Sequence, residues 1–355
     1  MQSPFRVLAP GRVCLFGEHS DYLGLGAIPA AISLRITIDA RPVEGNEIRI
    51  IYEDLNEVDQ FPIDAMAAYR HQRDYVRSAF NMMRRRGGHP EQAWEIVVSG
   101  DIPLAAGLSS SSALTVAAVL SFARIAGIDL STSDIAVTSF NAEVTEFHES
   151  GGMMDHLASA YGGVIHLDDH GLTQLPARLG GLVIGDSLEP KTDTVGDLVQ
   201  IRTQAEEGYS VLGARINGFD HRSTPLDRVE KVAHLIPDSC RLTTITTLRN
   251  RDITRRACSL LLDHVPDKEQ IGQMIDQHHH LLRDGLGRST PKIERLISAA
   301  KEAGALGCKI NGSGGGGTML AYAPGHERPV MEAIESAGGV PYMVEVDNGA
   351  RVVLI

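Results

Sequence analysis

The sequence has few cysteines, no excess of basic residues and no long uninterrupted apolar run. Its four cysteines are scattered and form no CxxC pair, so we expect neither a disulfide framework nor a zinc site of that kind. The 45 Asp and Glu residues outnumber the 33 Lys and Arg residues, which gives a formal net charge of −12. This charge argues against non-specific binding to nucleic acid or to an anionic membrane, although a local basic pocket stays open.

The most apolar helical stretch, residues 113–128, contains Thr115, Ser121 and Arg124 and is too short to span a bilayer comfortably. The first six residues lack the basic stretch and apolar core of a secretory signal. Together with the scarce cysteines, these features predict a cytoplasmic protein in a reducing compartment, with no membrane and no nucleic acid among its partners. They leave the oligomeric state open.

The length of 355 residues predicts about two domains at roughly 150 residues each. Alternating and helical periodicities in the first half predict strands at 5–8, 31–40, 47–52, 93–99, 163–168 and 182–186, and helices at 71–86, 110–126, 132–148 and 154–161. In the second half, the same periodicities predict helices at 226–235, 248–262, 268–282, 291–303 and 327–337, and strands at 309–312, 318–323, 342–346 and 351–354. We therefore expect an α+β protein with domains at 1–190 and 191–355, the second built on a small antiparallel sheet.

A turn rich in small residues at 103–114 leads directly into an apolar helix. The unpaired N–H groups and positive dipole end of such a helix favour an anion, and phosphate suits them. Glycine lets the backbone approach a ligand closely, and serine hydroxyls can contact phosphate or ligate Mg²⁺. The turn lacks the lysine of GxxxxGK[ST], so it is not a Walker P-loop. A helix capped by serine is the simpler alternative for this segment alone.

Two further segments make a ligand site the better interpretation. Arg12, Glu18, His19 and Asp21 crowd one short segment, and so many polar groups in an apolar setting are costly unless they bind a ligand or one another. Residues 311–317 hold five glycines, too many for a stable helix or strand, which indicates close backbone approach. A flexible hairpin is the alternative for that last segment.

The three segments, in their order and spacing over nearly the whole chain, closely resemble the GHMP kinases, and the first is similar to the galactokinase branch in particular. The resemblance implies a two-domain GHMP kinase fold, with an N-terminal domain like domain 2 of ribosomal protein S5 and a ferredoxin-like C-terminal domain. It also implies an ATP-dependent kinase that uses Mg²⁺ and acts in the cleft between the domains on a small-molecule acceptor.

The family resemblance assigns roles to individual positions. It implies that ATP is bound by Gly107, Leu108, Ser109, Ser110, Ser111, Ser112, Gly314 and Gly315. It also implies that Ser111 and Glu143 are the ligands of magnesium, and Glu146 is a close rival for Glu143. Asp155 accepts or orients the proton of the acceptor hydroxyl, while Arg12 holds that hydroxyl and the transferring phosphoryl group. A purely structural ion pair between Asp155 and Arg12 is the alternative.

The acceptor implied by the resemblance is a sugar, held by Glu18, His19 and Asp21 and phosphorylated at the anomeric hydroxyl. The match is imperfect, because Cys14 replaces an asparagine and Leu25 a glycine of galactokinases, and Ala105-Ala106 replaces a Gly-Ser pair. Residues 185–187 also stand where galactokinases carry Asn-Ser-Asn. Galactose or a related sugar is therefore expected, and the alternatives are a mevalonate-like isoprenoid kinase and a non-catalytic sensor of sugar and ATP.

Three consecutive histidines, His278, His279 and His280, raise the question of a metal site or a cloning tag. Consecutive helical side chains point about 100° apart and cannot easily share one ion. We therefore expect a solvated or inter-domain helix face.

Overall fold

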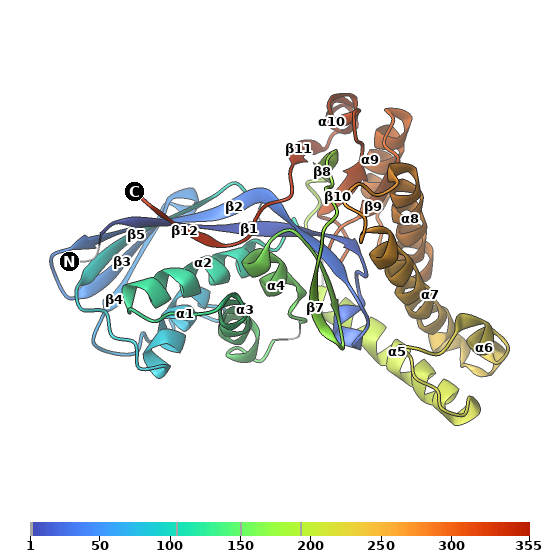
Figure 1. Cartoon of the computed structure of the whole chain (residues 1–355), viewed down its shortest axis with the longest axis horizontal. Coiled ribbons are helices and arrows are strands. Elements are labelled where there is room, and N and C mark those ends of the chain that lie inside the picture. Colours follow the sequence, from blue (N-terminus) through green and yellow to red (C-terminus); the bar gives the residue numbers. More distant parts are fainter. Residues whose placement is uncertain (1–2, 104–105, 150, 192–193) are drawn as a thin grey trace.

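The computed structural model describes residues 3–103, 106–149, 151–191 and 194–355, which form two sheets with helices packed against them (Figure 1). The first sheet follows the order β12-β1-β2-β5-β3-β4, with β6 paired to β2 and β7 paired to β6. Its strands are β1 (Phe5–Phe16), β2 (Ile28–Val43), β3 (Glu47–Tyr52), β4 (Glu57–Pro62), β5 (Ala93–Gly100), β6 (Val164–Asp168), β7 (Gly171–Leu175) and β12 (Arg351–Leu354). Strands β1 and β2 are long and pair antiparallel from Phe5 opposite Ala40 to Phe16 opposite Ile28.

Helices α1 to α4 lie together beneath the first sheet in the view of Figure 1. They are α1 (Tyr75–Arg85), α2 (Ser110–Ile125), α3 (Thr132–Phe140), which continues as a π-helical turn at Asn141–Thr145, and α4 (Met154–Tyr161). Helix α2 is apolar almost all round and is buried, with Ala113, Val116 and Ala117 fully inaccessible. A helix with this composition is buried in a core, and the packing of α2 against β1 places the start of α2 beside that strand.

The second sheet is antiparallel in the order β11-β8-β10-β9. Its strands are β8 (Leu182–Asp186), β9 (Gly307–Ile310), β10 (Thr318–Tyr322) and β11 (Val340–Val344). Helices α8 (Lys268–His280), α9 (Pro291–Glu302) and α10 (Glu327–Ser336) pack with it, and α5 (Thr194–Arg215), α6 (Leu226–Glu230) and α7 (Asp238–Leu260) extend away as a helical arm (Figure 1). None of the described helices is long and apolar enough to cross a membrane.

The small antiparallel sheet is present, but the expected place of strand 351–354 within it is wrong. Strand β12 pairs antiparallel with β1, with Phe5 opposite Leu354, so it belongs to the first sheet. Conversely β8, which precedes residue 190, belongs to the second sheet. The strand pairing thus crosses the expected division at residue 190 twice, because pairing depends on contacts between distant segments that local periodicity does not encode.

Several elements differ from their expected bounds. Strands β4 and β7 and helix α5 have no expected counterpart, since both strands are largely exposed and carry little apolar alternation. Helix α7 begins at Asp238, ten residues before the expected start. The helix expected at 132–148 changes to a π-helical turn at Asn141, and α1 begins at Tyr75 instead of residue 71.

The three histidines lie at the end of α8, where His278 and His279 are buried and His280 is exposed. The His278 ring stacks on Phe16 of β1 with the ring centroids 6.0 Å apart, and it is fully buried. His279 is hydrogen-bonded through Nε2 to Glu294 at 2.9 Å. The inter-domain interpretation therefore holds for His278, whereas the solvated one is wrong for His278 and His279 and holds for the exposed His280.

Candidate active site

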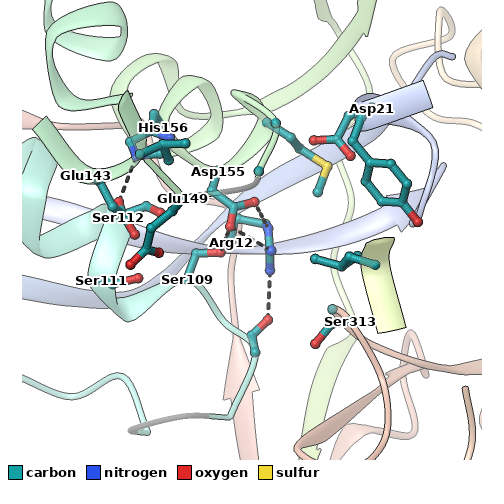
Figure 2. Close-up of a pocket in the computed structure, with 18 of the residues that line it drawn as sticks. Arg12, Asp21, Ser109, Ser111, Ser112, Glu143, Glu149, Asp155, His156 and Ser313 are labelled. Carbon is teal, nitrogen blue, oxygen red and sulfur yellow. Dashed lines mark hydrogen bonds and ion pairs between the residues drawn. The ribbon is translucent and has the colours of Figure 1, made fainter. Parts of the chain in front are cut away.

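A cavity of about 630 Å³ lies where the end of β1, the start of α2 and the start of α4 approach the glycine-rich segment after β9 (Figure 2). It brings together most of the site residues expected from the sequence. Those lining it are Arg12, Glu18, His19, Asp21, Gly107, Ser109, Ser110, Ser111, Ser112, Glu143 and Asp155. Segments that are more than 140 residues apart in the chain, such as those of Arg12 and Asp155, therefore meet at one place.

Leu108, Gly314 and Gly315 are the expected residues that do not line this cavity. The Leu108 side chain is buried in the core, and its carbonyl accepts the Arg12 backbone N–H at 3.0 Å. The Gly315 N–H donates to the Arg288 carbonyl at 2.9 Å, and a Cβ at Gly314 would lie 2.5 Å from the same oxygen. The cavity is instead bordered by Gly312 and by Ser313. Residues 104 and 105 of the serine-containing turn lie outside the described residues.

Arg12 and Asp155 form a bidentate ion pair at the centre of the cavity (Figure 2). Arg12 Nε is 2.8 Å from Asp155 Oδ1, and Arg12 Nη2 is 3.0 Å from Oδ2. The Ser109 hydroxyl donates to Oδ2 at 2.6 Å, and Arg12 Nη1 donates to the Gly107 carbonyl at 2.7 Å. Burial would raise the pKa of Asp155, but the Arg12 charge and the Ser109 hydroxyl outweigh it, so this pKa is lowered. Asp155 is therefore ionised at neutral pH.

The start of α2 presents backbone N–H groups to the same cavity. Ser109 precedes the helix in a left-handed conformation, with φ of 62°, and within the described chain no side chain caps this end. The serines of the first turn, Ser110, Ser111 and Ser112, all line the cavity. Free N–H groups, hydroxyls and the positive end of the helix dipole make this a favourable place for phosphate oxygens.

Glu143 lies in the π-helical turn and faces the start of α2 (Figure 2). Its Oε2 is 2.7 Å from His156 Nε2, and both side chains are almost completely buried. Oε1 has no hydrogen-bond partner among the described residues, so it is available to a ligand. Glu143 and Ser111 line the same cavity, and their carboxylate and hydroxyl oxygens fit the hard-oxygen preference of Mg²⁺. Because no cluster of three or more His, Cys, Asp or Glu in the described chain could hold a metal, phosphate oxygens and water would have to complete the coordination.

The rival carboxylate Glu146 is engaged elsewhere. It forms an ion pair with Arg85 at 2.6 Å and accepts a hydrogen bond from Tyr69 at 2.6 Å. The Arg85 hydrogen bond is the main reason that its pKa is lowered to about 2. Glu146 does not border the cavity, whereas Glu149, which pairs with Arg73, does. The surroundings of the two rivals therefore favour Glu143 as a ligand.

Glu18 is held by the second sheet. Its carboxylate forms a fully buried ion pair with Lys309 of β9, and its other oxygen accepts the Gly312 N–H. Lys309 Nζ also donates to the Cys14 carbonyl at 2.8 Å. Both Glu18 oxygens are thus occupied within the protein. These contacts and the burial of Glu18 favour a role in joining the turn after β1 to the segment after β9 over direct contact with an acceptor.

His19 is also fixed by protein contacts. Its Nε2 is 3.1 Å from the Ser313 carbonyl, and its Nδ1 is 2.9 Å from the Tyr22 hydroxyl. A carbonyl can only accept, so Nε2 carries the proton and Nδ1 accepts from Tyr22. Burial, followed by the charge of Arg288, lowers the pKa of His19 to about 3, so the ring is neutral. His19 thereby orients the Tyr22 hydroxyl at the cavity wall.

Asp21 is the carboxylate that faces the cavity without an ion-pair partner among the described residues (Figure 2). Burial and, next, the nearby Asp155 charge raise its pKa to about 6. It packs against Gly152, where a Cβ would lie 1.8 Å from Asp21 Oδ2, so any larger residue at Gly152 would displace this carboxylate. Asp21 and Asp155 together make this end of the cavity acidic.

The cavity also contains residues that sequence reasoning missed. They are Tyr22, Arg73, Val144, Glu149, Gly151, Gly152, Met154, His156, Lys191, Leu198, Gly312 and Ser313. Gly152, Met154 and His156 flank Asp155 and could have been found by proximity to it. Lys191 and Leu198 lie in no motif and had no local signal.

Family models match three parts of the chain. The model of the GHMP kinases N terminal domain matches residues 74–163, and that of the GHMP kinases C terminal domain matches 259–339. A galactokinase galactose-binding signature matches residues 1–42, which include the turn with Asp21. Together the matches cover more than half of the chain.

Relatives of two activities match almost the full length. A mevalonate kinase of Pyrococcus furiosus is 32% identical, over 96% of this chain and 95% of its own, and a galactokinase of Haemophilus influenzae is 27% identical, over 98% and 94%. Among solved structures, galactokinase of Lactococcus lactis complexed with galactose has a TM-score of 0.84 at 20% identity and covers 99% of this chain and 95% of its own. The Methanococcus jannaschii mevalonate kinase has a TM-score of 0.76 at 19% identity, with coverage of 97% and 98%. The structural likeness concerns the fold.

Proposed function

The chain belongs to the GHMP kinase family and has its two-domain α+β fold, and on that premise we propose that it transfers the γ-phosphoryl group of ATP to a hydroxyl of an uncharged sugar. The general activity, that of a phosphotransferase with an alcohol group as acceptor, is shared by its mevalonate kinase and galactokinase relatives. Galactose or a related sugar, phosphorylated at the anomeric oxygen, is the proposed substrate. The observation that carries the proposal is the unpaired Asp21 carboxylate beside Asp155.

Sugar hydroxyls are good donors to a carboxylate, whereas an acceptor with its own carboxylate is repelled by Asp21, whose charge is not offset as Arg12 offsets that of Asp155. Asp21 favours a neutral polyol at this end of the cavity for that reason. The galactose-binding signature over residues 1–42 supports the same choice. The competing substrate is mevalonate, which the greater identity to mevalonate kinases favours. Lys191, a cation that lines the cavity, would pair with the mevalonate carboxylate.

In the proposed complex, the phosphates of ATP lie at the start of α2, against the N–H groups and hydroxyls of Ser110, Ser111 and Ser112. Magnesium is held by Ser111 and Glu143, and when bound it neutralises phosphate charge. A second cavity of about 570 Å³ shares Arg73 with the first and is lined by Leu114 of α2. Its walls combine aromatic and apolar side chains, such as Tyr52, Leu55 and Tyr75, with charged ones, and the aromatic and apolar part suits the base of the nucleotide.

Asp155 accepts the hydrogen bond of the attacking hydroxyl and aligns its oxygen with the phosphorus. The proton passes to Asp155 as the new O–P bond forms, because a carboxylate of lowered pKa is a weak base until the hydroxyl becomes acidic. Arg12 stabilises the charge of the transferring group, and its two bonds to Asp155 keep both groups in place. The Arg12–Asp155 pair thus supplies positioning and charge, which phosphoryl transfer chiefly requires. A protein that only sensed sugar and ATP would not need this pair.

The test is ADP release with ATP, Mg²⁺ and a panel of galactose, glucose, a hexuronic acid and mevalonate. We expect turnover with a neutral sugar and an acid-labile phosphate in the product, as an anomeric phosphate requires. Asp21→Asn should raise the sugar KM about 10- to 100-fold with unchanged ATP affinity, whereas Asp263→Asn, at an exposed site, should change neither. Turnover of mevalonate at a lower KM than any sugar would refute the proposed substrate class.

A further inference from the structure

Lys191 enters the cavity from the segment that follows β8, far from the serine-containing turn in the sequence. Its Nζ is 3.3 Å from the Ser313 hydroxyl. It borders the same cavity as Gly107, Ser109 and Asp155. The ammonium group therefore stands where the start of α2 meets the glycine-rich segment after β9.

Glycines on both sides make room for this lysine. A Cβ at Gly107 would lie 2.2 Å from Lys191 Nζ, and a Cβ at Gly312 would lie 2.9 Å from it. At Gly317 a Cβ would lie 2.5 Å from Lys191 Cε. Backbone φ values of +85° at Gly107 and +75° at Gly312 further restrict these positions to glycine. The backbone on both sides of the cavity is shaped around the ammonium group.

No carboxylate of the described chain lies within ion-pair distance of Lys191. The charged groups around it are Arg12 from β1, Glu18 from the following turn, Asp155 from α4 and Arg288 from the segment after α8. Burial and then the Arg12 charge lower the pKa of Lys191 to about 8, so it is mostly protonated at neutral pH. Such a partly buried cation is costly without an anionic partner, which an anionic ligand would supply.

We propose that Lys191 binds the terminal phosphoryl group of ATP and follows it during transfer. The inference rests on the proposed placement of the ATP phosphates at the start of α2. Arg12 and Lys191 flank Gly107, since Arg12 donates to its carbonyl and Lys191 packs against its α-carbon. The two cations thus converge on the space in front of Ser109. The serine-containing turn carries no lysine of its own, and Lys191 supplies that charge from a distant part of the chain.

Lys191 takes no part in the proton transfer of the chemical step. The acceptor oxygen forms a bond to the γ-phosphorus, and the bond from that phosphorus to the bridging oxygen breaks. ADP leaves with the electron pair of the broken bond, and the hydroxyl proton passes to Asp155. Lys191 keeps its protons and lowers the energy of the charge that builds on the phosphoryl oxygens.

The first experiment compares the affinities of the full chain for ATP and ADP by calorimetry in the presence of Mg²⁺. Lys191→Met should weaken ATP binding about 10- to 100-fold and ADP binding by less than about 3-fold, because only ATP carries the terminal phosphate. Lys191→Arg should retain most of the ATP affinity. Lys231→Met, at the exposed end of α6, is the matched control and should bind both nucleotides as the parent does.

A pH profile separates phosphate binding from a structural role. Lys191 is charged below about pH 8 and neutral above it, so kcat/KM for ATP should decline above about pH 8 in the parent. In Lys191→Arg the decline should move to higher pH, because a guanidinium keeps its charge there. Equal loss of ATP and ADP affinity in a folded Lys191→Met variant, or a loss of acceptor affinity alone, would overturn the inference. If no sugar is turned over, the proposed function fails, but the comparison of ATP with ADP still decides the role of Lys191.

Discussion

Replacing Lys309 by methionine should be one of the most destabilising single changes in this molecule. Lys309 is fully buried and forms an ion pair with Glu18, whose side chain is 2% exposed. In Lys309→Met the Glu18 carboxylate stays buried and retains the Gly312 N–H as a donor. Removing one partner of a buried ion pair costs about 3–5 kcal/mol. At roughly 2 °C per kcal/mol for a chain of this size, the midpoint of thermal unfolding should fall by roughly 6–10 °C.

The double variant Glu18→Gln/Lys309→Met provides the decisive comparison. It removes both charges at once and should recover most of the lost stability, because a neutral pair of similar size avoids the buried unpaired charge. Arg328→Met serves as a control, since it breaks an exposed ion pair with Glu332 and should leave the midpoint unchanged within error.

Thermal unfolding gives the midpoint, and urea unfolding followed by circular dichroism and by the fluorescence of Trp94 gives the free energy of unfolding. Trp94 is the single tryptophan and is buried in the first sheet, so its signal reports that core, while circular dichroism reports the whole chain. Coincident transitions would show that the two sheets unfold together. A loss below about 1 kcal/mol in Lys309→Met, or additive losses in the double variant, would refute the reasoning.

Three further predictions concern activity. Asp155→Asn should lower kcat by roughly 10²–10⁴-fold in steady-state assays while ATP binding survives, and turnover within a few-fold of the parent would leave Asp155 as a structural partner only. The pKa of Asp21 is raised to about 6, so its charged form is lost as the pH falls below 6, and the sugar KM should rise there in the parent but not in Asp21→Asn. Ser111→Ala and Glu143→Gln should each raise the Mg²⁺ concentration needed for half-maximal rate, and unchanged magnesium titrations would remove both from the metal site.

Local features of the site could be predicted from the sequence. A small-residue turn before an apolar helix predicts an anion-binding helix start, and α2 begins at Ser110 as expected. The cluster from Arg12 to Asp21 does lie on one wall of a cavity. The start of α2 and the placement of this cluster could be predicted because neighbouring residues in the chain determine the local geometry, whereas anion binding at the helix start stays a prediction. The pairing of Arg12 with Asp155 depended on family resemblance, because no spacing joins such distant residues.

Contacts between distant segments could not be predicted. Glu18 carries the same local signal as Asp21, yet Glu18 is paired with Lys309 and Asp21 faces the cavity. The difference depends on where β9 lies against the end of β1, which tertiary packing decides. Lys191 illustrates the same limit, since a single lysine between two unremarkable segments has no pattern that marks it as part of a site. Strand β12 was misplaced for this reason as well.

The pairing of β1 with β12 has a consequence for biosynthesis. Phe5 to Leu8 emerge early from the ribosome, whereas their partners, Arg351 to Leu354, emerge only after the entire second sheet and the helical arm. The β1 edge of the first sheet therefore stays unpaired while most of the polypeptide is being translated. An unpaired strand edge can pair with other nascent chains. Translation of β12 covers this edge of β1 and leaves the short strand β12 as the outer strand, so the N-terminal sheet is completed last although it is begun first.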